Sequence, residues 1–176
     1  MTQRQYKREP LDDAQVDQLL NACRTFREKL IVFTLLDTGL RVSELSDLTK
    51  TDIQWQEKRL TIRGKGGPFG KKTKIRVLPM TDRVRPLIEH HYAMEDTFGI
   101  GKRQIQNIVR AVANRAGIGK PVSPHVLRHS FSVMCLKRGI GLRTLQALLG
   151  HDNIQTTEIY MNLSPEDVIR EFQDKW

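Results

Sequence analysis

The pattern that most constrains the fold is a short block of strand-like sequence enclosed on both sides by helical sequence. Residues 52–56, 60–63 and 75–78 are rich in β-branched and apolar residues and predict three short strands. The last two are separated by G-K-G-G-P-F-G-K-K-T-K, residues 64–74, whose glycines and proline predict a long, mobile and electropositive hairpin loop. We therefore expect an α+β fold that is mainly α-helical, with a small three-stranded antiparallel sheet and a long β-hairpin.

The rest of the chain has helical periodicity with recognisable helix ends. Gly39 and Gly150 are typical of residues that end a helix, and Ser123-Pro124 is typical of a helix start. Residues 1–10 are predicted to be a flexible lead-in to one domain over 11–176. The expected helices cover residues 11–22, 26–37, 42–48, 83–94, 102–116, 124–139, 143–149, 153–162 and 165–176.

Composition narrows the class of partner. The 176 residues include 29 Lys and Arg against 20 Asp and Glu, and a net charge of +9 favours DNA, RNA or an anionic membrane surface. Cys23 and Cys135 lie in apolar patterns without metal-ligand spacing, so we expect reduced core thiols, a cytoplasmic protein and no metal site. The first ten residues lack an apolar signal segment, and the longest apolar run, residues 30–36, is too short to span a membrane.

Four side chains in the last third suggest a reaction at a phosphodiester. His125, Arg128, His151 and Tyr160 are closely spaced, and Arg41 lies far upstream. A phosphodiester under attack gains negative charge on its equatorial oxygens, which two bidentate guanidinium groups neutralise better than lysines do. We therefore expect Arg41 and Arg128 to hold the phosphate while Tyr160 attacks it and forms a phosphotyrosine.

The leaving 5′-hydroxyl then needs a proton, and the phenol must lose one. Lys65 in the predicted hairpin is placed to act as the general acid. A histidine can accept the phenolic proton or donate a hydrogen bond to a phosphate oxygen. This chemistry needs no metal and no cofactor.

Simpler interpretations exist for each residue alone. Arg41 and Glu44 have the spacing of a surface ion pair, His129 is typical of a structural core histidine, and Tyr160 is typical of an amphipathic core residue. The hairpin lysines are typical of a solvated loop. These interpretations do not explain why all the residue types of one mechanism occur together in one basic chain.

Taken together, T-G-L-R-V-S-E-L, G-K-G, H-V-L-R-H-S and L-G-H followed by T-T-E-I-Y-M resemble the tyrosine recombinase or phage-integrase family, especially its Xer-like branch. The resemblance covers residues 11–176. It implies that Tyr160 is the nucleophile, that Glu44 and His129 support the site, and that the remaining catalytic residues are Arg41, Lys65, His125, Arg128 and His151.

The resemblance also implies what the protein acts on. The family cleaves double-stranded DNA through a 3′-phosphotyrosyl intermediate, and four protomers pass through a Holliday junction. We expect a monomer when free and a homotetramer on DNA, joined by exchange of the last helix, residues 165–176. The residues expected to contact DNA are Lys71, Lys72, Lys74, Lys102, Arg103 and Arg110.

Three departures from the family pattern stand out. Only about ten residues precede the catalytic fold, so the N-terminal core-binding domain of the family, itself of ordinary domain size, is expected to be absent from this chain. The hairpin exceeds the compact G-K-G-x-K-x-R pattern, which leaves Lys71, Lys72 and Lys74 as alternatives to Lys65. The stretch 92–102 is shorter than usual, which points to a different site preference.

Other functions fit parts of the sequence. Residues 141–162 have the outline of a helix–turn–helix, as in a DNA-binding regulator without chemistry. A type IB-like topoisomerase shares the chemistry but relaxes supercoils as a monomer. An RNA-binding module is disfavoured because aromatic residues make up only 6% of the chain and show no stacking platform.

Overall fold

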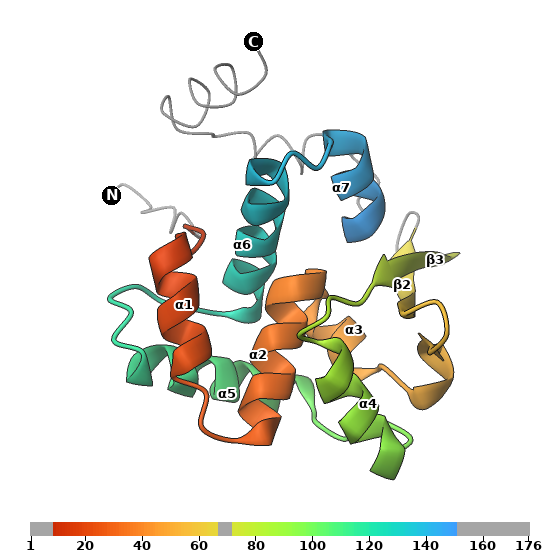
Figure 1. Ribbon diagram of the computed structural model, residues 1–176, viewed down its shortest axis with the longest axis horizontal. Helices are drawn as coiled ribbons and strands as arrows, with labels where there is room; N and C mark the ends of the chain where they lie inside the picture. The colour runs from red at the N-terminus through yellow and green to blue at the C-terminus, as the bar shows by residue number, and fades with distance from the viewer. Residues whose placement is uncertain (1–8, 67–71, 151–176) are drawn as a thin grey trace.

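The computed structural model describes residues 9–66 and 72–150 (Figure 1). His151, Tyr160 and the helices predicted over 153–162 and 165–176 lie outside the described residues. The described part is mainly helical with one small sheet, as expected from the sequence.

Three helices precede the sheet. They are α1 (Asp13–Asn21), α2 (Phe26–Thr38) and α3 (Val42–Ser46). The Asp12 side chain accepts a hydrogen bond from the Gln15 amide and begins α1, and Gly39 ends α2 in the left-handed conformation with φ 62°. The helix expected over 42–48 is present as α3, but it ends earlier, at Ser46.

The sheet consists of β1 (Ile53–Gln54), β2 (Arg59–Gly66) and β3 (Lys72–Pro79), preceded by a short 3-10 helix, η1 (Lys50–Asp52). The strands are antiparallel in the order β1-β2-β3. The prediction of a loop over residues 64–74 is wrong at both ends, because Gly64 pairs with Lys74 and Gly66 with Lys72. Glycines and lysines continue the ladder here because its hydrogen bonds use the backbone alone.

Within the described residues up to 150, the helices after the sheet are α4 (Arg85–Met94), α5 (Lys102–Arg115), α6 (Pro124–Lys137) and α7 (Leu142–Leu149). Ser123 caps α6 as predicted by accepting a hydrogen bond from the Val126 amide, and Gly150 ends α7 with φ 67°. Figure 1 shows α6 beside α2, and α7 beside β3.

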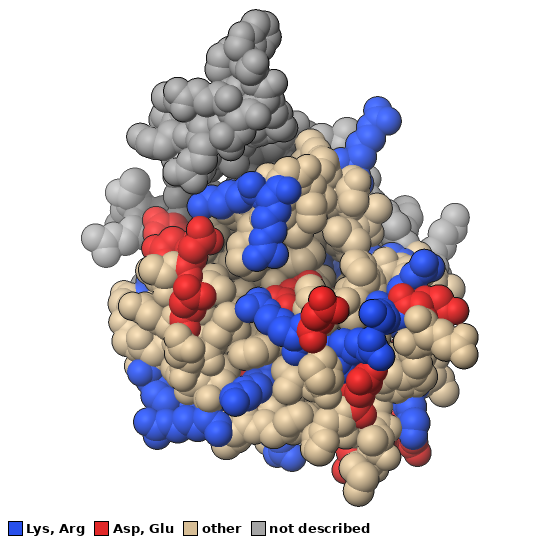
Figure 2. All heavy atoms as spheres, in the orientation of Figure 1, with Lys and Arg blue, Asp and Glu red and all other residues tan. Residues whose placement is uncertain are grey.

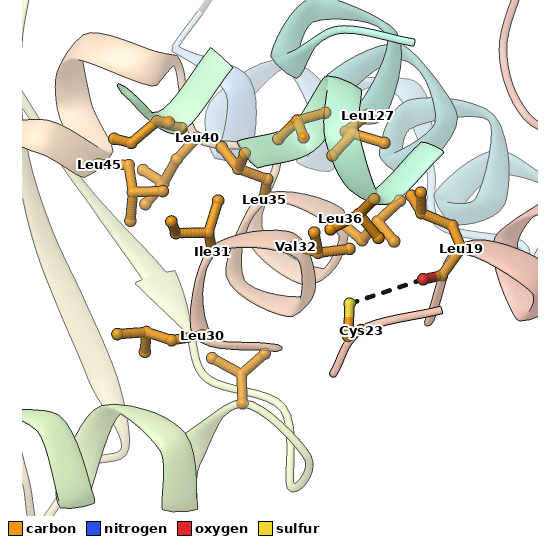
Figure 3. Packing of buried hydrophobic residues seen from close by; sticks show 14 of the residues in the cluster. Leu19, Cys23, Leu30, Ile31, Val32, Leu35, Leu36, Leu40, Leu45 and Leu127 are labelled. Atoms are coloured by element: carbon orange, nitrogen blue, oxygen red, sulfur yellow. Dashed lines mark hydrogen bonds between the residues drawn. The ribbon is translucent and has the colours of Figure 1, made fainter. Parts of the chain in front are cut away.

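Helix α2 is the centre of the core. Figure 3 shows five of its apolar side chains among residues from α1, α3 and α6. They are at most 1% exposed, and burying each stabilises the fold by roughly 1.5–3 kcal/mol. The five α2 residues are Leu30, Ile31, Val32, Leu35 and Leu36.

A smaller cluster of Phe131, Cys135, Leu145 and Leu149 packs α7 onto α6. The two clusters fix the end of α2 and the end of α7 on the same helix, α6.

Both cysteines are free and buried, which confirms the prediction of core thiols. Burial raises the pKa of Cys23 and Cys135 from 9.0 to about 11. Cys23 Sγ donates a weak hydrogen bond of 3.6 Å to the Leu19 carbonyl (Figure 3). Within residues 9–66 and 72–150, none of the helices is long and apolar enough to cross a membrane.

Candidate active site

The first half of the site lies at the start of α3. Arg41 is the N-cap residue of this helix, and its side chain is 37% exposed. The Arg41 amide donates to Glu44 Oε2 over 2.8 Å, and Arg41 Nη1 donates to Glu44 Oε1 over 2.9 Å. Glu44 therefore satisfies a backbone group at the helix start and orients the guanidinium of Arg41.

Glu44 is shared with a second arginine, Arg76 of β3. Arg76 Nη1 and Nη2 each donate to one Glu44 oxygen over 2.8 Å, and the two side chains are 7% and 4% exposed. Burial works against the charge of Glu44, but the hydrogen bonds and positive charge of Arg76, and to a lesser degree Arg41, lower its pKa from 4.5 to about 2. The pair Arg41–Glu44 is therefore not the surface ion pair that its spacing alone suggests.

Arg128 forms the second half of the site from α6. Its guanidinium is buried, Nη1 donates to the Gly39 carbonyl, and Nη2 donates to the Leu149 carbonyl over 2.7 Å. Gly39 lies two residues before Arg41, so Arg128 holds the turn that presents Arg41. A Cβ atom at Gly39 would lie 2.4 Å from the Phe131 ring, which explains why this turn needs glycine.

Two arginines hold consecutive carbonyl groups at the end of α7. Arg76 Nε donates to the Leu148 carbonyl over 2.7 Å, next to the Leu149 carbonyl that Arg128 binds. Both carbonyls belong to the last helical turn, whose acceptors lack partners within the helix. Arg76 also covers Gly150, where a Cβ atom would lie 3.0 Å from Arg76 Cδ. The residue that follows Gly150 in the sequence is His151.

The structure thus brings together Arg41, Glu44 and Arg128, three of the residues predicted from distant parts of the sequence. His125 lies in the first turn of α6 and is exposed, whereas Arg128 one turn later is buried. His129 is half-buried rather than a fully buried core residue. Lys65 lies in β2 and its register partner is Thr73 of β3, so it belongs to a paired strand and not to a loop.

The predicted DNA-contacting residues are distributed over two regions. Lys72 and Lys74 lie in β3, and Lys71 lies outside the described residues. Lys102, Arg103 and Arg110 are exposed on α5. In Figure 2, basic side chains cover the part of the surface where Figure 1 places α5, while acidic side chains are interspersed elsewhere on that face. Among residues 9–66 and 72–150, no cluster of three or more His, Cys, Asp and Glu side chains is placed to hold a metal ion.

Arg76 lies among Arg41, Glu44 and Arg128, but the sequence analysis did not identify it as part of the site. Because side chains alternate across a strand, Arg76 shares its face with Leu78, which is 1% exposed, while Ile75 and Val77 are 63% and 43% exposed. Two signals could have found Arg76. Residues 74–76 read K-I-R like the end of the G-K-G-x-K-x-R pattern, and Arg76 alternates with Leu78 on the face of the sheet that helices cover.

The mainly helical fold with one small antiparallel sheet agrees with the fold class expected from the sequence motifs. The family model described as "Phage integrase family" matches residues 9–167, and this chain belongs to that family. The family expected from the sequence motifs is therefore confirmed.

Curated relatives of this chain are Xer recombinases. The tyrosine recombinase XerA of Saccharolobus solfataricus is 34% identical over 166 residues, covering 92% of this chain and 55% of the relative. The tyrosine recombinase XerD of Listeria innocua is 32% identical over 185 residues, covering 94% of this chain and 62% of the relative. The chain thus spans little more than half the length of the curated relatives it matches.

Solved structures agree with this assignment of the fold. The crystal structure of XerA recombinase superposes with a TM-score of 0.79 at 27% identity, covering 95% of this chain and 65% of that chain. A post-cleavage complex of the XerH site-specific recombinase bound to palindromic difH substrate superposes with a TM-score of 0.76 at 19% identity, covering 97% and 54%. The expected fold class is therefore confirmed.

Proposed function

We propose that this chain carries out the DNA cleavage and rejoining chemistry of a site-specific recombinase. The observation that carries the proposal is the junction of three family motifs at one place. Arg41 and Glu44 from the first motif, Arg128 from the second, and the end of α7 before the third are joined by hydrogen bonds. In this cluster two guanidinium groups, Arg41 and Arg76, share one carboxylate, which leaves an excess of positive charge suited to a phosphate.

In the proposed reaction the phenolic oxygen of Tyr160 attacks a DNA phosphorus atom. The new oxygen–phosphorus bond forms as the bond to the 5′ oxygen breaks, which leaves a 3′-phosphotyrosine and a free 5′ end. His125 or His151 takes the phenolic proton or donates a hydrogen bond to the phosphate, and Lys65 gives a proton to the 5′ oxygen. Arg41 and Arg128 neutralise the charge of the transition state. Attack by a 5′-hydroxyl of another strand reverses these steps and rejoins the DNA.

The DNA partner follows from the same proposal. The net charge of +9, the strand-borne Lys72 and Lys74, and the exposed basic residues of α5 support binding to a DNA backbone. We further propose that four protomers assemble on two DNA sites and that residues 165–176 join neighbouring protomers.

The covalent intermediate gives the direct test. The full chain is incubated with a library of end-labelled nicked duplexes with randomised sequence, in which a fragment lost after cleavage prevents religation. The expected product is a protein–DNA adduct that survives denaturation and is resolved on a gel, and sequencing the trapped DNA reports the site. Tyr160→Phe should form no adduct yet retain most DNA binding, because it lacks only the nucleophilic oxygen. Absence of an adduct with the wild-type chain, or an equal adduct with Tyr160→Phe, contradicts the proposal.

A second measurement separates recombination from simple relaxation. Two circular plasmids that carry the selected site are incubated with the chain, and products are scored for fused circles and for loss of supercoils. Fused circles are expected from a recombinase. Relaxation without exchange identifies the topoisomerase alternative, and DNA binding without either reaction identifies the regulator alternative.

A further inference from the structure

The side chain of Arg76 contacts two separate parts of the described site. It reaches from β3 to the carboxylate of Glu44 in α3 and to the Leu148 carbonyl at the end of α7. All three of its nitrogen atoms donate hydrogen bonds of 2.7–2.8 Å within these contacts. These bonds engage every nitrogen atom of the guanidinium, so we assign Arg76 to holding its neighbours and not to contacting the substrate.

We propose that Arg76 is a positioning residue that fixes the Arg41 guanidinium and the end of α7, where the segment beginning at His151 starts, in one alignment. This inference rests on the proposed function, since alignment matters only if these residues act on one phosphate. It assigns to β3 a role beyond carrying lysines: the strand joins the two halves of the site.

The geometry supports a role in alignment through Glu44. The carboxylate accepts four hydrogen bonds, two from Arg76 and two from the backbone and side chain of Arg41. Such a bidentate pair fixes the plane of the carboxylate, and the plane fixes where Arg41 Nη1 can lie. Loss of Arg76 leaves Glu44 anchored by Arg41 alone, which is the more exposed of the two partners.

The geometry also supports a role at the end of α7. Arg76 covers the Gly150 backbone and binds the carbonyl of Leu148, while Arg128 binds the next carbonyl. The two guanidinium groups together hold the last turn of α7 up to Gly150. A shift of the reacting groups by about 1 Å is enough to lower a rate about 100-fold.

The informative variant is Arg76→Lys, which keeps the positive charge but cannot form the bidentate pair and the Nε bond together. The matched control is Arg63→Lys on the neighbouring strand β2, because Arg63 pairs with the buried carboxylate of Asp52 outside the cluster. The full chain is assayed with the nicked duplex selected above, at saturating DNA, and both the rate and the final amount of adduct are recorded.

We expect Arg76→Lys to lower the adduct rate about 10- to 100-fold with an unchanged final amount and nearly unchanged DNA affinity. Arg63→Lys should keep the wild-type rate. Equal rates for the two variants overturn the proposal. A lower final amount of adduct at the wild-type rate also overturns it, because that result means only that fewer molecules are folded.

A second substrate separates alignment from general loosening. A methylphosphonate at the cleavage position lacks one charged oxygen, so it depends less on Arg41. A variant that misplaces Arg41 should therefore lose less of its adduct rate on the methylphosphonate than on the normal phosphate. For both Arg76→Lys and Arg41→Ala, the loss of adduct rate relative to the wild type should be smaller on the methylphosphonate than on the phosphate, and by the same factor. An equal penalty for Arg76→Lys on both substrates overturns the assignment.

A double variant serves if Arg76→Lys folds poorly, and hydrogen exchange serves if the chain forms no adduct. Glu44→Gln combined with Arg76→Gln removes both buried charges, and its rate should match the worse single variant, because both residues act through one pair; multiplied losses overturn the proposal. Amide hydrogen exchange needs no catalysis. Arg76→Lys should speed exchange at Gly150, whose amide donates to Gln146, relative to Arg63→Lys, and unchanged protection overturns the proposal even where adduct forms.

Discussion

Arg41 and Arg128 have the same predicted role but very different surroundings. Arg41 lies at the start of a five-residue helix, 37% exposed, and is held by the charged carboxylate of Glu44. Arg128 is buried within a fourteen-residue helix and donates to the neutral backbone carbonyls of Gly39 and Leu149. The carboxylate that holds Arg41 titrates, whereas the peptide groups that accept hydrogen bonds from Arg128 do not.

This difference separates two tasks that a phosphate site must perform. The bonds of Arg128 join α6, the end of α2 and the end of α7, so this residue belongs to the fold as much as to the site. Arg41 depends on Arg76 for its orientation through Glu44 but contributes little packing of its own. We therefore expect substitutions on the Arg128 side to affect stability and reaction together, and those on the Arg41 side to affect mainly the reaction.

The largest effect is expected for Arg128→Ala. The adduct rate should fall at least 100- to 1,000-fold, as for loss of a transition-state donor. The free energy of unfolding should also fall by roughly 2 kcal/mol or more, because two buried carbonyls lose their partner. Rapid-quench adduct assays and urea denaturation measure the two quantities. A large loss of rate with wild-type stability would show that Arg128 does not stabilise the fold.

For Arg41→Ala we expect a similar loss of rate, about 100- to 1,000-fold. Its free energy of unfolding should change by about 1 kcal/mol or less, because the exposed side of an ion pair contributes little and Glu44 keeps Arg76. The same two assays apply. A drop in stability as large as that of Arg128→Ala shows that the two arginines are structurally equivalent.

Gly39→Ala tests the turn that Arg128 holds and that leads to Arg41. The new Cβ would lie 2.4 Å from the Phe131 ring at a φ of +62°, so we expect a loss of about 3 kcal/mol in the free energy of unfolding. Gly117→Ala is the matched control, because Gly117 has φ +71° but nothing within 4 Å of the added atom. Thermal and urea denaturation compare them, and equal losses mean that Phe131 moves aside at little cost.

The last effect appears at acid pH, through the carboxylate on the Arg41 side. The pKa of Glu44 is lowered from 4.5 to about 2, so the stability that its charge contributes is present above pH 4.5 and is lost as the pH falls toward 2. The full loss is on the order of 3 kcal/mol. Urea denaturation between pH 5 and pH 2 should show a shallower decline for Glu44→Gln than for the wild type.

Glu89→Gln provides the control for this measurement, because Glu89 forms an exposed pair with Arg85. Its stability should follow the wild-type pH dependence. The same decline in Glu44→Gln and in the wild type shows that the shared carboxylate does not account for acid sensitivity.

Local signals predicted the helices well because the bonds that end a helix are made by neighbours in sequence. Ser123, Gly39 and Gly150 all lie at the helix ends where the sequence places them. The hairpin was predicted too short in its strands, since a ladder is made by backbone groups of residues that are distant in sequence. Composition around Lys65 favours a loop, but pairing across the ladder determines the conformation there.

The sequence indicated Arg41, Glu44 and Arg128 because each lies in a recognisable pattern, and the structure joins them through Gly39. Arg76 also matches a pattern, since residues 74–76 read K-I-R like the end of G-K-G-x-K-x-R. It was overlooked because an arginine in a short strand is usually solvated, and its burial depends on α3 and α7 covering one face of the sheet.

The glycines of T-G-L-R and L-G-H depend on residues that lie outside these two motifs. Each glycine faces a side chain from elsewhere in the chain: Phe131 against Gly39, and Arg76 against Gly150. A larger residue at either glycine becomes tolerable only after its distant neighbour shrinks, and the positive φ remains an obstacle even then. Phe131 and Arg76 should therefore vary together with these glycines in the lineage, although neither residue lies in the motif that it constrains.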